Sequence, residues 1–130
     1  NDIAQKVVKA KIYYTAETNG LNKKWTGNVW LNPPYASELI GKFVDKLIKE
    51  QEHYEQAIIL VNNATETEWF RKIISIASAV CFPKGRVKFY LPDGKTGAPL
   101  QGQAILYIGA SPKKFTDTFL KVGWCCGVLR

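Results

Sequence analysis

The sequence predicts an α/β sandwich with a largely parallel central sheet, an antiparallel edge hairpin and helices on both faces. Residues 29–31 and 57–61 are short continuous apolar runs, typical of strands buried on both sides of a parallel sheet. Segments with helical spacing of apolar residues alternate with these runs. Residues 86–90 and 103–108 have strand patterns around a loop rich in glycine and proline, which indicates the hairpin.

The size and composition of the chain restrict its class. Its 130 residues suit one domain, residues 1–130, and 46% are hydrophobic. No apolar run has the length of a membrane span and no signal-peptide pattern opens the chain, so we expect a cytoplasmic protein without a membrane partner. A net charge of +7 suits a polyanionic partner, and equally a merely solvated basic surface.

The cysteines and the single histidine do not match a metal site or a disulfide framework. Cys81 stands alone, Cys125 and Cys126 are adjacent, and His53 lies in a polar stretch. Zinc sites use spaced cysteine pairs and histidines. We therefore predict reduced thiols and no metal.

Apolar residues at three- and four-residue intervals predict four helices. Asp2 and Ser37 are expected to cap the first two, and Thr65 with Glu68 forms a capping-box pattern before the third. Ser111 or Pro112 begins the fourth. A last strand or packed tail is expected over 123–130. The predicted helices cover residues 2–11, 37 to about 51, a stretch from about 65, and 113–122.

The strand at residues 28–31 stops abruptly at Asn32-Pro33-Pro34-Tyr35. A residue before proline is pushed toward extended geometry, and proline has a fixed φ and no N–H. The result is a stiff corner at the carboxyl end of a strand, which is where open α/β sheets bind ligands.

This corner suits an exocyclic amine on a flat heterocycle, such as N6 of adenine. The amine lone pair is delocalised into the ring, so the amine needs two acceptors that hold its N–H groups. The Asn32 side-chain oxygen and the Pro33 carbonyl can act as those acceptors. Tyr35 can stack on a flipped base, and Pro34 sets the corner. The alternative is a proline-terminated strand with a packed tyrosine.

Asn62 and Asn63 follow the apolar run 57–61, so we expect them at the same sheet edge as Asn32. Asn62 has either a role in the site or a role in turn formation. Trp69 either flanks the target pocket or belongs to the core.

Basic residues gather near the glycine- and proline-rich loop. Lys84, Arg86 and Lys88 can contact a phosphate backbone, with Lys95 in the loop itself, or the loop can order over substrate. The alternative is an ordinary solvated hairpin.

Several motifs occur in an order that resembles the small phage-type, Dam-like DNA N6-adenine methyltransferases, over residues 1–119. The motifs are Asn19-Gly20-Leu21 with Trp25, the stretch 29–35, the stretch 60–70, and Gly85-Arg86-Val87-x-Phe89. The resemblance implies a Rossmann-like methyltransferase sheet, S-adenosylmethionine as cofactor and DNA as partner. It also implies cofactor contacts at Asn32 and Asp2, and favours Arg86 for DNA.

Other interpretations remain open. The chain has no methionine and begins at Asn1, so we expect it to lack an N-terminal segment of such an enzyme. Methylation of a protein glutamine poses the same electronic problem as adenine N6 and uses a similar corner. A catalytically silent DNA-binding domain is the alternative from another class.

Overall fold

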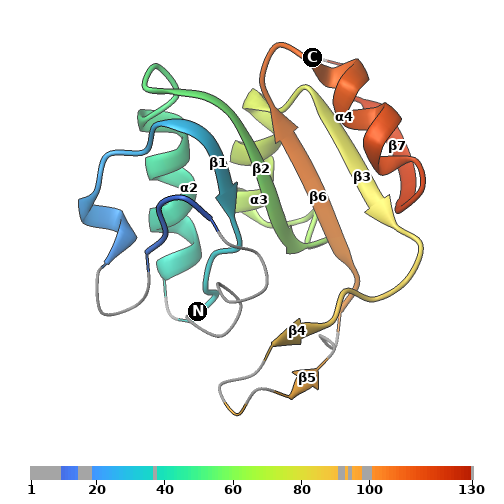
Figure 1. Cartoon of the computed structure of the whole chain (residues 1–130), viewed down its shortest axis with the longest axis horizontal. Coiled ribbons are helices and arrows are strands. Elements are labelled where there is room, and N and C mark those ends of the chain that lie inside the picture. The colour runs from blue at the N-terminus through green and yellow to red at the C-terminus, as the bar shows by residue number, and fades with distance from the viewer. Residues whose placement is uncertain are drawn as a thin grey trace.

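The computed structural model describes residues 10–14, 19–36, 38–90, 93, 95–97 and 101–129, without the side chains of residues 89 and 90. Figure 1 shows the order of its helices and strands. They are the 3-10 helix η1 (Gly20–Asn22), β1 (Gly27–Leu31), α2 (Leu39–Lys49), β2 (Tyr54–Asn62), α3 (Glu68–Ile76), β3 (Ala79–Pro83), β4 (Phe89–Tyr90), β5 (Thr96–Gly97), β6 (Gln103–Ile108), α4 (Pro112–Phe119) and β7 (Gly123–Gly127).

The central sheet has the strand order β1-β2-β6-β3-β7. Only β1 and β2 pair in parallel, whereas β6 is antiparallel to β2 and to β3, and β7 is antiparallel to β3. The prediction of a mostly parallel sheet is therefore wrong. The physical reason is the position of β6, which lies between strands of one direction and separates them.

The predicted edge hairpin is also wrong. Strand β6 is buried at all six positions, as expected for the centre of a sheet. Only residues 89–90 of the expected partner strand are extended, and they pair with β5 in a separate two-stranded ribbon. The apolar side chains of β6 are buried more completely between β2 and β3 than they would be in an edge strand.

Alternation along β2 divides the core between the two faces of the sheet. Ile59 and Val61 point to a cluster with Val44, Leu47 and Ile73 of α2 and α3. On the other face, Leu60 belongs to a cluster that includes Ile105 and Tyr107 of β6 and Phe115 of α4. Helices therefore cover both faces, as the sequence predicted. Full burial of a side chain such as Leu47 stabilises the fold by about 1.5–3 kcal/mol.

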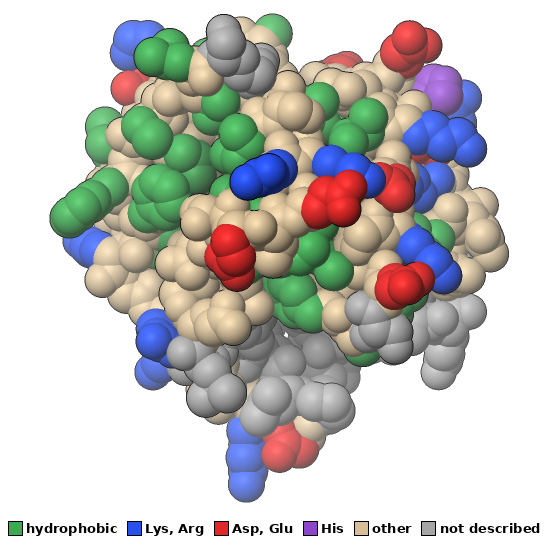
Figure 2. All heavy atoms as spheres, turned by 180° about the vertical axis from the view of Figure 1, so that it is seen from behind, with side chains coloured by type: hydrophobic (Ala, Val, Ile, Leu, Met, Phe, Trp, Pro, Cys, Tyr) green, Lys and Arg blue, Asp and Glu red, His purple; other side chains and the backbone are tan. Residues whose placement is uncertain are grey.

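Helices α2 and α3 form the layer seen in Figure 2, where basic and acidic side chains lie among hydrophobic ones. Hydrophobic side chains gather beside this layer, toward the β3–β7 end of the sheet. Phe82 and Trp124 pair across β3 and β7 there, and Trp124 is 79% exposed.

The helix starts differ in detail from the expected ones. The Thr67 hydroxyl accepts the N–H of Phe70 at 3.3 Å, so α3 begins after Thr67 instead of through the predicted box of Thr65 and Glu68. Helix α4 begins at Pro112, as predicted. Of the helix expected over 2–11, residues 2–9 lie outside the described residues and residues 10–11 are not helical; Ser37 is also outside them.

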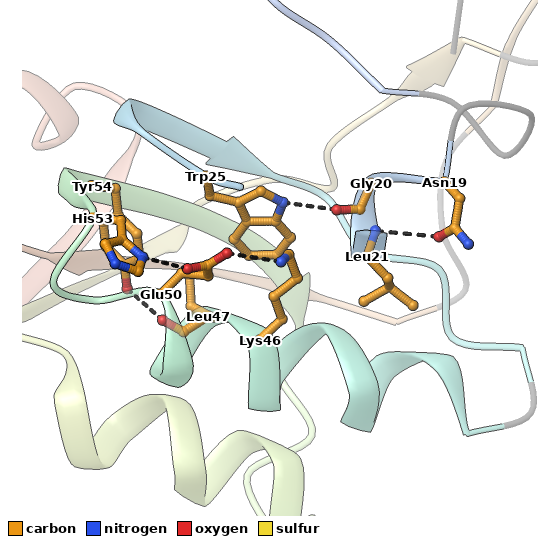
Figure 3. Close-up of polar contacts among 9 residues, drawn as sticks. All are labelled: Asn19, Gly20, Leu21, Trp25, Lys46, Leu47, Glu50, His53 and Tyr54. Carbon is orange, nitrogen blue, oxygen red and sulfur yellow. Dashed lines mark hydrogen bonds and ion pairs between the residues drawn. The ribbon is translucent and has the colours of Figure 1, made fainter. Parts of the chain in front are cut away.

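A polar cluster joins the last turns of α2 to the chain before β1 (Figure 3). The Trp25 indole donates to the Gly20 carbonyl at 3.0 Å, and the Lys46 ammonium lies 5.3 Å from the Trp25 ring centre. Lys46 pairs with Glu50 at 2.9 Å, and His53 contacts the same carboxylate at 2.6 Å. The Lys46 hydrogen bond, followed by that of His53, lowers the pKa of Glu50 to about 2.

None of the described helices is long and apolar enough to cross a membrane.

Candidate functional site

The carboxyl ends of three strands meet at one edge of the sheet. β1 and β2 are parallel, and β3 has the same direction because both β2 and β3 are antiparallel to β6. Figure 1 shows the arrowheads of these three strands pointing to the same edge. Leu31 is level with Ile59, so β2 continues three residues beyond β1, to Asn62. The segments after the three strands are therefore presented together.

The corner after β1 has one buried residue and three exposed ones. Pro33 is buried, which anchors the turn, whereas Asn32, Pro34 and Tyr35 are exposed. The Asn32 side-chain amide makes no hydrogen bond to any described residue. Among the described residues, its acceptor and donor groups therefore have no partner that would compete with a ligand.

The side chain of Tyr35 reaches from the corner to the end of β2. Its phenol oxygen accepts the backbone N–H of Asn62 at 2.6 Å. Burial raises the pKa of Tyr35, and the hydrogen bond from Asn62 opposes that rise. The phenol is therefore neutral at physiological pH, and its position is held by the backbone of the neighbouring strand.

A depression of about 450 Å³ lies where α2 and α3 begin, and this volume is within the range of ligand sites. One wall is aromatic: the rings of Tyr35 and Trp69 are 6.0 Å apart and inclined at 55°. Near the rim, Lys72 pairs with Asp45 at 3.0 Å and lies 3.8 Å from Glu68. The lining residues are Tyr35, Glu38, Ile40, Gly41, Glu68, Trp69 and Lys72.

The basic residues predicted to contact DNA follow β3. Lys84, Arg86 and Lys88 are all exposed, and the Lys84 N–H donates to the Val122 carbonyl at 3.1 Å. Because β3 ends at the same sheet edge as β1, this segment begins on the corner's side of the molecule.

The structure therefore brings Tyr35, Asn62 and Trp69 together. The segment that carries Lys84, Arg86 and Lys88 begins where β3 ends, at the same end of the sheet. Asp2, expected at the cofactor, lies outside the described residues. In the described part of the chain, no group of three or more histidine, cysteine or acidic side chains is arranged to hold a metal ion.

Sequence reasoning missed Gln103. Its side-chain N–H donates to the Asn62 side-chain oxygen at 2.5 Å, so it contacts the same residue that holds Tyr35. The available signal was a glutamine at the start of an otherwise apolar strand. Buried polar groups are nearly always hydrogen-bonded, so a glutamine in an apolar strand calls for a search for its partners.

Comparison with known proteins gives two matches. The sequence pattern of the family described as DNA N-6-adenine-methyltransferase (Dam) matches residues 3–114, which include the whole corner. The DNA N-6-adenine-methyltransferase of Escherichia phage T1 is 43% identical over 60 residues, which are 45% of this chain and 24% of the phage protein. The aligned stretch thus spans about a quarter of that relative's length.

Proposed function

Because this chain belongs to the DNA N-6-adenine-methyltransferase (Dam) family, we propose that it methylates N6 of adenine in DNA, with S-adenosylmethionine as donor. The reaction is assigned to the corner Asn32-Pro33-Pro34-Tyr35. One observation carries the assignment. The Asn32 amide is exposed and makes no hydrogen bond within the described residues, and Tyr35, on the same short corner, is bonded to the end of β2. The pairing of a free amide with a fixed ring suits a flat base that carries an amine.

In this mechanism, the corner prepares the amine for attack. The Asn32 side-chain oxygen and the Pro33 carbonyl accept the two N–H groups of N6, which draws the nitrogen toward tetrahedral geometry and frees its lone pair. The same two dipoles stabilise the positive charge that develops on the nitrogen, until one of the two N6 protons leaves to solvent and the neutral methylamine remains. Since the acceptors stand on a stiff proline corner, little reorganisation is needed when the base arrives.

S-adenosylmethionine, when bound, supplies the electrophilic methyl group. We assign Asn32 to the boundary between cofactor and amine. The exposed Asn32 amide supports this assignment, because it offers a donor and an acceptor that no other described residue occupies. Asp2, which lies outside the described residues, is proposed as a second contact to the cofactor.

The aromatic wall supports recognition of a flipped base. Stacking on an aromatic ring compensates the loss of stacking in the duplex. Tyr35 supplies the stacking face, and Trp69 flanks it at 6.0 Å. The net charge of +7 and the exposed Lys84, Arg86 and Lys88 are suited to the phosphate backbone. We also propose that Asn62 serves this site by holding the phenol of Tyr35.

The proposal is tested by transfer of a tritium-labelled methyl group to adenine-containing DNA, with this chain and with one extended at the N-terminus. We expect labelling at N6, and its loss in Asn32→Ala with the fold retained. Asn22→Ala is the matched control, since Asn22 is exposed in η1.

The outcomes separate the competing functions. Labelling of a glutamine-containing peptide in place of DNA would support the protein glutamine methyltransferase. DNA binding without labelling by either chain would contradict the proposal and support a silent binding domain. Labelling by the extended chain alone would place part of the cofactor site upstream of this chain.

A further inference from the structure

Gln103 is a buried polar residue that the proposed reaction does not use. It is only 5% exposed, and its side-chain oxygen has no hydrogen-bond partner among the residues that the structure describes. Its other end donates to the Asn62 side-chain oxygen at 2.5 Å. Native proteins contain few buried polar atoms without a partner, and those that persist call for a reason other than stability.

The half-satisfied state of Gln103 does not depend on how the amides are oriented. If both amides were turned over, the Gln103 oxygen would accept from Asn62 and the Gln103 nitrogen would lack a partner. A hydrophobic side chain of the same size would remove this cost. The glutamine is therefore not explained by packing alone.

A chain of contacts leads from Gln103 to the corner. Asn62 and Gln103 stand opposite each other in the pairing of β2 with β6. Asn62 is held at its side chain by Gln103, and its backbone N–H donates to Tyr35. Beside this pair, the Asn63 N–H donates to the Gly102 carbonyl at 3.1 Å. A Cβ on Gly102 would lie 2.9 Å from the Asn63 amide, so this glycine admits the close approach.

We propose that Gln103 is a positioning residue for the Asn32-Pro33-Pro34-Tyr35 corner, acting through Asn62 on the phenol of Tyr35. Gln103 holds the last residue of β2, that residue holds the phenol, and the phenol sets the place of the stacking ring. An amide at this position leaves one hydrogen-bonding group unsatisfied among the described residues, which a hydrocarbon side chain would not. The bond to Asn62 is what the amide provides in return. The effect on methyl transfer rests on the proposed function; the contacts do not.

The first test is structural and needs no activity. Gln103→Leu removes the amide at nearly constant volume, and Gln103→Met replaces it if the leucine variant does not fold. Amide-resolved NMR of the full chain reports the Asn62 N–H and the Tyr35 ring. We expect both to shift in Gln103→Leu, while the melting temperature does not fall. Gln101→Leu is the matched control, because Gln101 is an exposed glutamine two residues earlier.

The second test is a double-mutant cycle on methyl transfer. We expect Gln103→Leu to lower kcat/KM for DNA by about tenfold, since small displacements of reacting groups have effects of this order or larger. In a Tyr35→Phe background, the same substitution should have less than about a twofold further effect, because the two changes break one chain of contacts.

The outcomes distinguish the two proposals. An unchanged Asn62 N–H and Tyr35 ring in Gln103→Leu overturn the positioning role, as does full additivity with Tyr35→Phe. A melting temperature that falls with the activity assigns Gln103 to stability alone and also overturns it. If the wild-type chain labels no DNA, the proposed function fails, and the NMR comparison still decides the role of Gln103.

Discussion

The phenol oxygen of Tyr35 accepts the backbone N–H of Asn62 at 2.6 Å, across 27 residues of sequence. This bond joins the corner after β1 to the end of the neighbouring strand. Because the acceptor is a side chain and the donor is backbone, the tyrosine is held by a group that substitution at position 62 does not remove. The Tyr35 ring, and with it the aromatic wall, is thus positioned by the fold itself.

The hydrogen bond of Tyr35 and its aromatic ring can be tested separately with Tyr35→Phe and Tyr35→Ala, which we expect to differ in DNA affinity. Tyr35→Phe removes the acceptor and retains the ring, so we expect a loss of about 0.5–1.5 kcal/mol in the free energy of unfolding. Methyl transfer should fall by about tenfold, as in Gln103→Leu, because both changes break the same chain of contacts. Tyr35→Ala also removes the stacking face, worth about 1–3 kcal/mol per base, so DNA affinity should fall by about tenfold or more. Urea unfolding and fluorescence anisotropy measure the two effects.

Tyr13→Phe is the control for this comparison, since Tyr13 is 46% exposed and lies outside the corner. Equal losses of affinity in Tyr35→Phe and Tyr35→Ala would contradict stacking by the ring.

The basic segment predicts a position-dependent effect of salt. Lys84→Ala with Lys88→Ala should weaken DNA binding and reduce the slope of log K against log salt by about 0.9 for each lost phosphate contact. Lys113→Ala with Lys114→Ala removes the same charge from the start of α4. That helix follows β6, so its start lies at the opposite edge of the sheet. Salt titrations with equal slopes for the two double variants would show that only net charge matters.

Glu50 predicts a loss of stability in acid. Its pKa is lowered from 4.5 to about 2 in the folded protein, first by the hydrogen bond from Lys46. The ionised form is therefore favoured by folding, and its contribution is complete above pH 4.5 and lost as the pH falls toward 2. Melting temperatures between pH 7 and pH 2.5 should decline less steeply in Glu50→Gln than in wild type.

Glu52→Gln provides the control for Glu50, because Glu52 is an exposed glutamate two residues away. If Glu52→Gln and Glu50→Gln reduce the acid-induced decline of the melting temperature equally, the Lys46–Glu50 pair is not the source of that decline.

The core of the sheet predicts a large effect of truncation at Ile59. This side chain is fully buried on the face of α2 and α3. Ile59→Ala leaves a cavity and should lower the free energy of unfolding by about 2–5 kcal/mol. Ile12→Ala, at a side chain that is 67% exposed, should change it by less than about 0.5 kcal/mol. Urea denaturation gives both values, and similar values would contradict the placement of β2.

Local patterns predicted most of the elements. The apolar runs that became β1 and β2, the three- and four-residue spacing of α2, and the proline start of α4 all depend on neighbours within a few residues. The capping residue of α3 was misjudged by two positions, because Thr65 and Thr67 are both good caps and only the folded turn selects between them.

The sequence by itself determined the stiff corner at Asn32, its place at a strand end, and the family to which the chain belongs. These properties follow from proline geometry and from the order of short motifs. Only the tertiary structure decided that β6 lies between β2 and β3, that Tyr35 bonds to Asn62, and that the Gln103 amide bonds to the Asn62 side chain. The physical reason is that strand order and the partners of polar side chains arise from contacts between distant segments, which the alternation of residues along one strand does not specify.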